Sequence, residues 1–448
     1  MSATDVHPVD AVLPPGQMFL VGLQHVLVMY AGAIAVPLIV GGALKLPKDQ
    51  LALLINADLF ACGVATLIQC IGVWKFGIRL PVVMGVTFAA VGPLVAMANA
   101  GLNAQAMYGA VIVAGIATML VAPVFSRLLR FFPPVVTGTI IAVIGITLLR
   151  VGITWAGGGT GAKPFGAIGN LSIALVVLIS ILAVNKYLRG FWANISVLLG
   201  LVVGFLLALP LDKVNLTGVA EASWFAIVLP FSFGFPEFEF GSIISLCLVM
   251  FVVMVESTGM FLALGEVTKR SVTPADLTRG LRADGLGTVI GGIFNTFPYT
   301  SFSQNVGLVG VTGVRSRWVV AVSGGILIAL GLVPKLATLV ASIPQAVLGG
   351  AGIAMFGMVA ATGIKILSRV DFENRSNLLI VAISIGAGMI PLVSPAFFDE
   401  FPKWTGSLTH SGITLTAIVA VALNAFLNGA GKAADGNASA VATAVMEG

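Results

Sequence analysis

Long apolar runs recur along the whole chain, from Gln17 to Asn428. Each run is long enough to span a membrane, because a helix of about 20 apolar residues crosses a hydrocarbon core of about 30 Å. Only 9% of the 448 residues are charged, whereas soluble domains carry roughly 25% charged residues. The sequence therefore predicts an all-α polytopic membrane protein, and it excludes a soluble enzyme with a single anchor.

Hydropathy, together with the positions of Gly and Pro, divides the apolar sequence into 14 predicted transmembrane segments. They cover residues 17–43, 50–72, 81–97, 105–125, 132–152, 168–186, 192–210, 240–265, 283–295, 300–313, 316–333, 337–360, 376–393 and 411–428. The third, ninth and tenth segments are short or interrupted by Gly and Pro. Interrupted segments are the ones in which a membrane protein is expected to bind its ligand.

Most of the 23 Lys and Arg residues fall in alternate predicted loops. This richer set comprises Lys75, Arg79, Arg127, Arg130, Lys186, Arg189, Lys269, Arg270, Arg279, Arg282, Arg315, Arg317, Lys365, Arg369 and Arg375. Basic loops stay in the cytoplasm and the number of segments is even, so both termini are expected there. This distribution accounts for the net charge of +5 without a nucleic-acid partner.

The two ends of the chain differ in composition from the apolar body. Residues 1–16 have no basic start and no small-residue cleavage site, which predicts a cytoplasmic tail rather than a signal peptide. Residues 429–448 are rich in Ala, Gly and Ser, which predicts a mobile tail. The three cysteines lie inside apolar runs at spacings that fit no metal-ligand pattern, so no metal is expected.

Two halves of the chain resemble each other. FPPVVTG, from Phe132, matches IPQAVLG, from Ile343, at an offset of 211 residues, and Thr87-Phe88 matches Ser301-Phe302 at an offset of 214. Chance similarity between apolar segments is the alternative explanation. If the match is real, each half has seven spans, and an odd number forces the second half to enter the membrane from the opposite side. The prediction is a 7+7 inverted repeat whose third and tenth segments form the binding site.

Four ionisable side chains are predicted at membrane depth: His25, Asp58, Glu256 and Asp284. A charge there costs at least about 2.5–3.5 kcal/mol, so each residue is a functional candidate. Glu256 follows an uncharged stretch from Phe240 to Val255. Its carboxyl group is suited to exchanging a proton between the two sides and to accepting paired N–H groups of a planar base. The alternative is a structural contact with a neighbouring helix.

The other three residues have simpler alternatives. Asp284 either caps a helix or pairs with Arg282 or Arg279, or it relays protons, and the sequence favours neither explanation. His25 is more consistent with hydrogen bonds between two helices than with a substrate ligand. For Asp58, interhelical packing is likewise the favoured explanation.

The densest polar run in any apolar stretch extends over residues 295–317. Thr300, Ser301, Ser303, Gln304 and Asn305 supply hydroxyl and amide groups that both donate and accept hydrogen bonds. Such groups suit a heterocycle whose edge alternates donors and acceptors. No residue from 285 to 314 is charged, which favours a binding site within the membrane over an exposed polar loop.

At this level of detail the chain resembles the nucleobase–ascorbate transporter family (nucleobase:cation symporter 2) along essentially its whole length. The signature of that family is matched by Gln304-Asn305-Val306-Gly307 followed by Thr312-Gly313. FPPVVTG, Gln24-His25 and Glu256-Ser257-Thr258-Gly259 also look like the family.

The resemblance implies a bacterial inner-membrane purine importer, driven by protons and needing no cofactor, that works as an elevator-type homodimer. Residues 17–125 and 240–333 would form a core domain, and residues 132–210 and 337–428 a gate domain. Short strands in segments 3 and 10 would hold the substrate between them.

The resemblance also implies roles for individual residues. Glu256 and Gln304 would bind the base through their side chains, Phe88 would pack on it, and Ser303 would contribute backbone. Asn305 would shape the site, and Asp284, His25 and Thr87 would support it or the proton path.

Met260 is a departure within the family pattern. Many members carry Asp or His four residues after the glutamate, on the same helix face, whereas this chain has Met260. This looks like the urate branch, since losing a carboxylate would tolerate the extra carbonyl or the anionic form of urate. The alternatives are xanthine or a broader purine range and, less favoured, an anion exchanger of the same architecture. An enzyme is not expected, because no catalytic set is recognisable.

Overall fold

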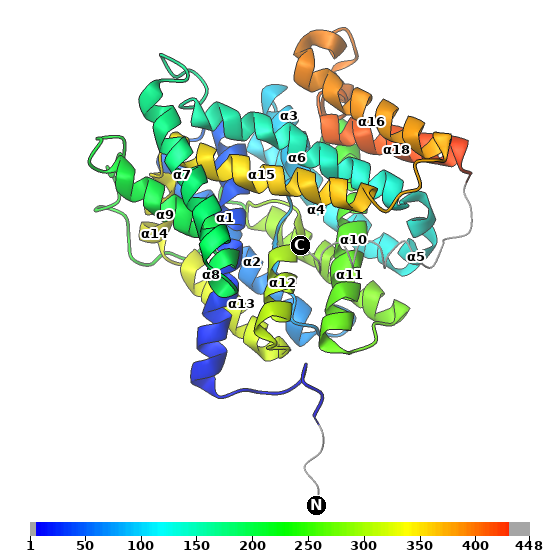
Figure 1. Cartoon of the computed structure of the whole chain (residues 1–448), viewed down its shortest axis with the longest axis horizontal. Helices are drawn as coiled ribbons and strands as arrows, with labels where there is room; N and C mark the ends of the chain where they lie inside the picture. Colours follow the sequence, from blue (N-terminus) through cyan, green and yellow to red (C-terminus); the bar gives the residue numbers. More distant parts are fainter. Residues whose placement is uncertain (1–5, 430–448) are drawn as a thin grey trace, which may run out of the picture.

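The structure is a computed structural model that describes residues 6–429 and is predominantly helical (Figure 1). Among the described residues, eight helices are long and apolar enough to cross a membrane. They are α1 (Pro15–Ala43), α2 (Lys48–Ile71), α4 (Ala104–Val121), α6 (Pro134–Ala156), α7 (Ile168–Tyr187), α10 (Phe240–Thr268), α15 (Gln345–Leu367) and α16 (Arg375–Val393). The predicted helical membrane protein is thus confirmed.

Shorter and bent elements account for the remaining apolar sequence. Helices α13 (Arg317–Gly331) and α14 (Pro334–Ala341) meet at 79° and would count as a ninth span together. The other main elements are α3 (Val91–Asn99), α9 (Ser196–Ala208), α11 (Pro274–Ile293), α12 (Ser303–Thr312), α18 (Gly412–Leu427) and two strands, β1 (Met84–Val86) and β2 (Tyr299–Ser301). Short helical turns complete the described chain: η1 (Phe88–Ala90), η2 (Ala122–Val124), α5 (Phe125–Leu128), η3 (Leu129–Phe131), α8 (Phe191–Asn194), η4 (Pro395–Phe398), η5 (Lys403–Thr405) and α17 (Gly406–Thr409).

The predicted bounds of the twelfth segment were wrong. The twelfth segment was expected to run unbroken through residues 337–360, but α14 ends at Ala341 and α15 begins at Gln345. Pro344 stands at the N-cap of α15, and a proline cannot donate the backbone hydrogen bond that a continuous helix would need there. Because both helices are apolar, hydropathy alone did not indicate the break between them.

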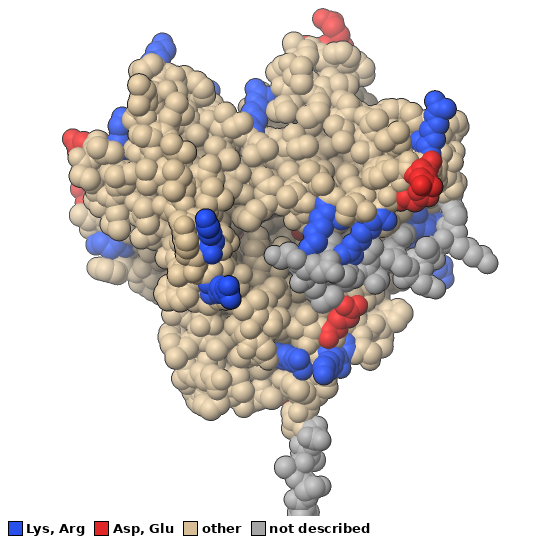
Figure 2. All heavy atoms as spheres, viewed as in Figure 1, with Lys and Arg blue, Asp and Glu red and all other residues tan. Residues whose placement is uncertain are grey.

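The surface fits a lipid environment. On the face drawn in Figure 2, Lys, Arg, Asp and Glu form small groups separated by broad uncharged areas. Helix α7 illustrates the cause, because Leu175, Ile179 and Leu182 are all exposed. Large apolar side chains that repeat along one exposed helix face are favourable against lipid tails and unfavourable against water.

Helices α6 and α15 form the most extensive helix pair among the described residues. A Cβ atom on Gly145 would overlap the backbone of Ala360, and one on Gly363 would overlap that of Ala142. Glycines therefore let the two backbones approach closely, as small residues do between membrane helices. Positions rise along α6 as their partners fall along α15, so the two helices are antiparallel.

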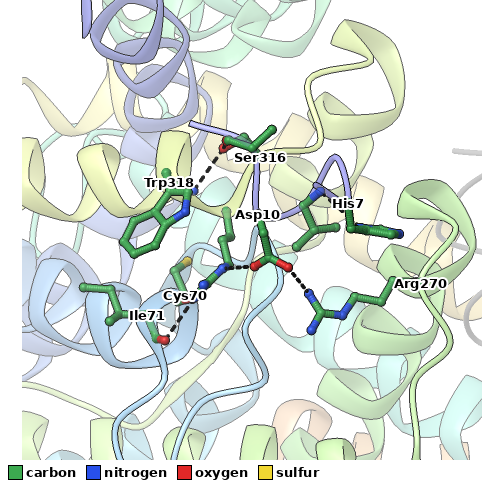
Figure 3. A network of polar contacts seen from close by, with 10 residues as sticks. His7, Asp10, Cys70, Ile71, Arg270, Ser316 and Trp318 are labelled. Carbon is green, nitrogen blue, oxygen red and sulfur yellow. Dashed lines mark hydrogen bonds and ion pairs between the residues drawn. The ribbon is translucent and has the colours of Figure 1, made fainter. Parts of the chain in front are cut away.

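The N-terminal segment from residue 6 to Pro14 packs against the protein rather than extending as a free tail (Figure 3). The Asp10 carboxylate lies 2.6 Å from Nε of Arg317 and 3.1 Å from Nη1 of Arg270. The Arg317 N–H donates to the carbonyl of Val9, which is fully buried. The segment is thereby tied to α13 and to the end of α10. A mobile C-terminal tail was predicted for residues 429–448, and from residue 430 onward this segment lies outside the part of the chain that the structure describes.

Candidate functional site

Two interrupted segments meet at the middle of the fold through β1 and β2. The strands pair antiparallel, with Met84 opposite Ser301, Gly85 opposite Thr300 and Val86 opposite Tyr299. Two further bonds extend the pairing, from the N–H of Thr87 to the carbonyl of Pro298 and from that of Phe302 to Val83. Each strand thus satisfies backbone groups of the other, which hydrocarbon cannot do. Short strands were predicted in these two segments, and both are present.

A cavity opens beside this strand pair. It is lined by Val86, Thr87, Phe88, Ala89, Ile141, Ile144, Glu256, Thr300, Ser301, Phe302, Ser303, Gln304 and Val359. All four residues predicted to bind substrate are in this set, although they come from three distant parts of the sequence. The cavity is therefore the candidate site.

Glu256 lies on α10 with its side chain half-buried, while the residues next to it, Val255 and Ser257, are buried. The Ser257 hydroxyl accepts a hydrogen bond from the N–H of Ser301 at 3.4 Å and lies 3.4 Å from the Thr300 hydroxyl. Helix α10 and strand β2 are therefore joined at the residue next to the carboxylate. The exposed part of Glu256 faces the cavity that it lines.

Ser303 and Gln304 form the first turn of α12, directly after β2. Gln304 is exposed and Ser303 is half-buried, and the Ser303 hydroxyl donates to Oε1 of Gln304 at 3.4 Å. Phe88, at the start of η1, has its ring edge-on to Phe356 with 5.9 Å between ring centroids. The cavity thus combines a carboxylate, an amide, hydroxyls and aromatic rings within otherwise apolar walls.

Asn305 and His25 lie behind the cavity rather than in it. Nδ2 of Asn305 donates to the main-chain carbonyl of His25 at 2.9 Å and lies 3.1 Å from its Nδ1. Both residues are buried. They join α12 to α1 and so fix the helix that carries Gln304.

The chain is similar to known transport proteins over most of its length. Residues 16–397 match the model of a permease family. The chain is 56% identical to the uric acid transporter UacT of Escherichia coli (strain K12) over 94% of its own length and 88% of that protein's. The chain belongs to the nucleobase–ascorbate transporter family. It is a family of transporters rather than enzymes.

Two further similarities place this nucleobase–ascorbate transporter among known proteins and folds. It is 47% identical to the xanthine permease of Bacillus subtilis (strain 168), over 93% of this chain and 95% of that one. The transmembrane domain of the cyanobacterial bicarbonate transporter BicA has the same fold, with a TM-score of 0.59. Since BicA is only 15% identical, over 91% of this chain and 96% of that domain, it indicates the fold alone.

The position of Asp284 corrects one expectation. The apolar sequence placed this residue at the start of a helix from 283 to 295, which made helix capping a possible role. Helix α11 instead begins at Pro274, where Thr273 and Asp276 form a capping box. Asp284 is buried in mid-helix, and its Oδ1 accepts from Nε2 of Gln69 on α2 at 2.9 Å. The capping interpretation was therefore wrong, and among the described residues no salt bridge involves Asp284.

Met260 lies one helical turn after Glu256 on α10 and is 3% exposed. It is not among the residues that line the cavity. Met260 thus places an uncharged side chain one helical turn from Glu256 without lining the cavity itself.

The sequence did not identify the apolar lining of the site. Ile141 and Ile144 on α6 and Val359 on α15 face the same cavity as Glu256. Each lies in an apolar stretch of its helix, so no polarity pattern distinguishes these three residues from those that face lipid. The sequence indicated Phe302 only as the repeat partner of Phe88. In the structure both phenylalanines lie shortly after a strand, Phe88 after β1 and Phe302 after β2.

Proposed function

We propose that this protein imports uric acid across the bacterial inner membrane by proton symport. The observation that carries the proposal is the cavity, in which the Glu256 carboxylate and the Gln304 amide lie with the rings of Phe88 and Phe302. A purine presents a flat apolar face and an edge of alternating donors and acceptors. Aromatic rings suit the face, while a carboxylate and an amide suit the edge.

The composition of the cavity favours this function over anion exchange. No Lys, Arg or His is among its described lining residues. A site for a small inorganic anion must offset the cost of removing the anion from water. In this cavity only the first turn of α12 offers a partial positive charge for that purpose. Glu256 would repel such an anion.

Proton coupling is assigned to Glu256, because it is the ionisable residue of the cavity lining. Taking up a proton with the base would neutralise the carboxylate for the passage across the membrane. This mechanism needs neither a cofactor nor a metal, since the proton gradient supplies the driving force.

Helix packing supports a division into two domains. In the proposed gate, α6, α7 and α15 pack closely together, as do α16 and α18, and in the proposed core α2 packs on α13 and α4 on α11. Gate helices supply Ile141, Ile144 and Val359 to the cavity, and core segments supply its polar residues. We infer that the core, residues 17–125 and 240–333, carries the substrate past the gate, residues 132–210 and 337–428, in an elevator-type homodimer.

The antiparallel pairing of α6 and α15 supports the 7+7 inverted repeat of 14 spans. Gly152 and Gly363 occupy matched places in the two halves, at the offset of 211 residues. They make reciprocal contacts, since Gly363 packs on Ala142 of α6 and Gly152 on Ile353 of α15. A two-fold axis between the halves would produce this pattern. With an even number of spans and the basic loops inside, both termini would lie in the cytoplasm.

Met260→Asp should shift the preference from uric acid towards xanthine. A carboxylate one turn from Glu256 adds negative charge behind the site and disfavours the anionic form of urate. The expected change in the ratio of uptake efficiencies is about tenfold, which corresponds to about 1.4 kcal/mol. Competition by xanthine against radiolabelled uric acid measures it. Met260→Asn, which matches Asp in size and carries no charge, is the control, and an unchanged ratio for Met260→Asp would refute the electrostatic explanation.

Uptake in cells that lack their own purine transporters tests the proposed substrate. Cells producing this protein should accumulate radiolabelled uric acid, and unlabelled bicarbonate should not compete. Accumulation of xanthine but not uric acid would replace the substrate by the one named for the Bacillus subtilis relative.

A further inference from the structure

Asp58 is a buried carboxylate outside the candidate site, and its hydrogen bonds reach the segment that forms β2. It lies on α2 and is 1% exposed. Its Oδ1 accepts from the hydroxyl of Thr296 at 2.8 Å and from the hydroxyl of Tyr299 at 3.0 Å. The Tyr299 hydroxyl also lies 3.1 Å from the main-chain carbonyl of Asp58. Asp58 therefore bonds both to Thr296, which precedes β2, and to Tyr299, the first residue of β2.

The ring of Tyr299 is fixed along its whole length. It is fully buried and lies against α11, where a Cβ atom on Gly291 would approach its Cε2 to 2.8 Å. Its backbone N–H donates to the hydroxyl of Thr288 at 3.1 Å. The position of the hydroxyl consequently determines where the backbone of residue 299 lies.

Residues Thr300 to Gln304 follow Tyr299 directly, and every one of them lines the cavity. Ser301 is paired with Met84 of β1, and its N–H donates to Ser257 beside Glu256. A displacement of Tyr299 would be transmitted through this short extended stretch to the polar groups of the site. Sites of this kind tolerate small displacements poorly, since a shift of about 1 Å can cost about a hundredfold in rate.

We propose that Asp58 is a positioning residue, which holds β2 at the depth the site requires by accepting hydrogen bonds from Thr296 and Tyr299. It does not line the cavity and acts on β2 through these two hydroxyls, while its other oxygen, Oδ2, accepts a weak hydrogen bond from Sγ of Cys62 on the same helix at 3.8 Å. A role of this kind needs an acceptor oxygen rather than a negative charge. The inference rests on the proposed function only for the identity of the ligand.

The variant Tyr299→Phe isolates this contact, because it removes the hydroxyl and keeps the ring. Its matched control is Tyr108→Phe, since Tyr108 on α4 is also buried and its hydroxyl has no hydrogen-bond partner among the described residues. Purified Tyr299→Phe protein should bind uric acid at least about tenfold more weakly than wild type. Tyr108→Phe should bind it as wild type does.

Hydrogen exchange adds a measurement that does not depend on the ligand. In Tyr299→Phe, amides of the peptide covering residues 299–303 should exchange about tenfold faster, as expected when a local contact that holds a segment closed is lost. A merely structural role for the hydroxyl would lower the unfolding temperature and leave the Kd of the folded protein and this local exchange unchanged. Unchanged Kd and unchanged exchange in Tyr299→Phe would overturn the inference.

Two variants of Asp58 test which property of the side chain matters. Asp58→Asn retains an acceptor oxygen and should keep Kd within about threefold of wild type, whereas Asp58→Ala should resemble Tyr299→Phe. Combining Asp58→Ala with Tyr299→Phe should weaken binding no more than Asp58→Ala alone, because both variants remove the same hydrogen bond between Tyr299 and Asp58. A complete loss of binding in Asp58→Asn would contradict the positioning role. If wild type itself fails to bind uric acid, the proposed function is wrong, and the exchange rates still decide the role of Asp58.

Discussion

Glu256→Gln should reduce uric acid uptake at least about a hundredfold, which corresponds to about 2.7 kcal/mol. The substitution keeps the size of the side chain but replaces one acceptor oxygen with an NH₂ donor. That donor replaces one of the two acceptor oxygens that the carboxylate offers to the N–H groups of an arriving base before it is protonated, so the first binding step is weakened. The amide also cannot exchange a proton at neutral pH, so coupling should be lost together with binding.

The matched control for this variant is Glu266→Gln. Glu266 lies on the same helix, α10, but is exposed and does not line the cavity. Its variant should transport uric acid at the wild-type rate. Initial rates of radiolabelled uptake, normalised to the amount of protein in the membrane, make the comparison. Full uptake by Glu256→Gln would remove this residue from the site.

Gly85→Ala should also abolish most uptake, for a steric reason. Gly85 lies in β1 opposite Thr300, and a Cβ atom there would overlap the ring of Phe302. Phe302 is 4% exposed and lines the cavity, so a displacement of its ring would change the shape of the site. We expect at least about a tenfold loss of uptake efficiency, since overpacking typically costs about 1–3 kcal/mol.

A control and a compensating change make this prediction specific. Gly325→Ala on α13 adds the same methyl group where nothing lies within 4 Å, and it should leave uptake unchanged. Adding Phe302→Leu to Gly85→Ala should give a smaller loss than the two single losses combined, because the smaller side chain relieves the overlap. Strictly additive losses would show that the two residues do not act through this contact.

The sequence predicted the polar part of the site because membrane depth makes polar residues conspicuous. Glu256 and Gln304 are identifiable from polarity in an apolar context alone, and the family signature strengthens Gln304. The repeat match between Thr87-Phe88 and Ser301-Phe302 placed two segments together that the structure joins through β1 and β2. These predictions succeed because they depend on local composition.

Other features depend on contacts that composition does not reveal. Asp58 meets Tyr299 across 241 residues of sequence, and nothing in the neighbourhood of either residue indicates the partner. The start of α11 was misplaced because hydropathy locates the edge of the hydrocarbon rather than the end of a helix. The polar turns from Pro274 to Arg282 continue the same helix outside the apolar stretch.

The most direct test of the central claim is proton movement in proteoliposomes that contain only this protein and a pH-sensitive dye inside. Adding uric acid outside, with no initial pH difference, should acidify the interior at a rate that depends on uric acid and disappears in Glu256→Gln. Entry of radiolabelled uric acid at the same rate without any internal acidification would contradict proton symport.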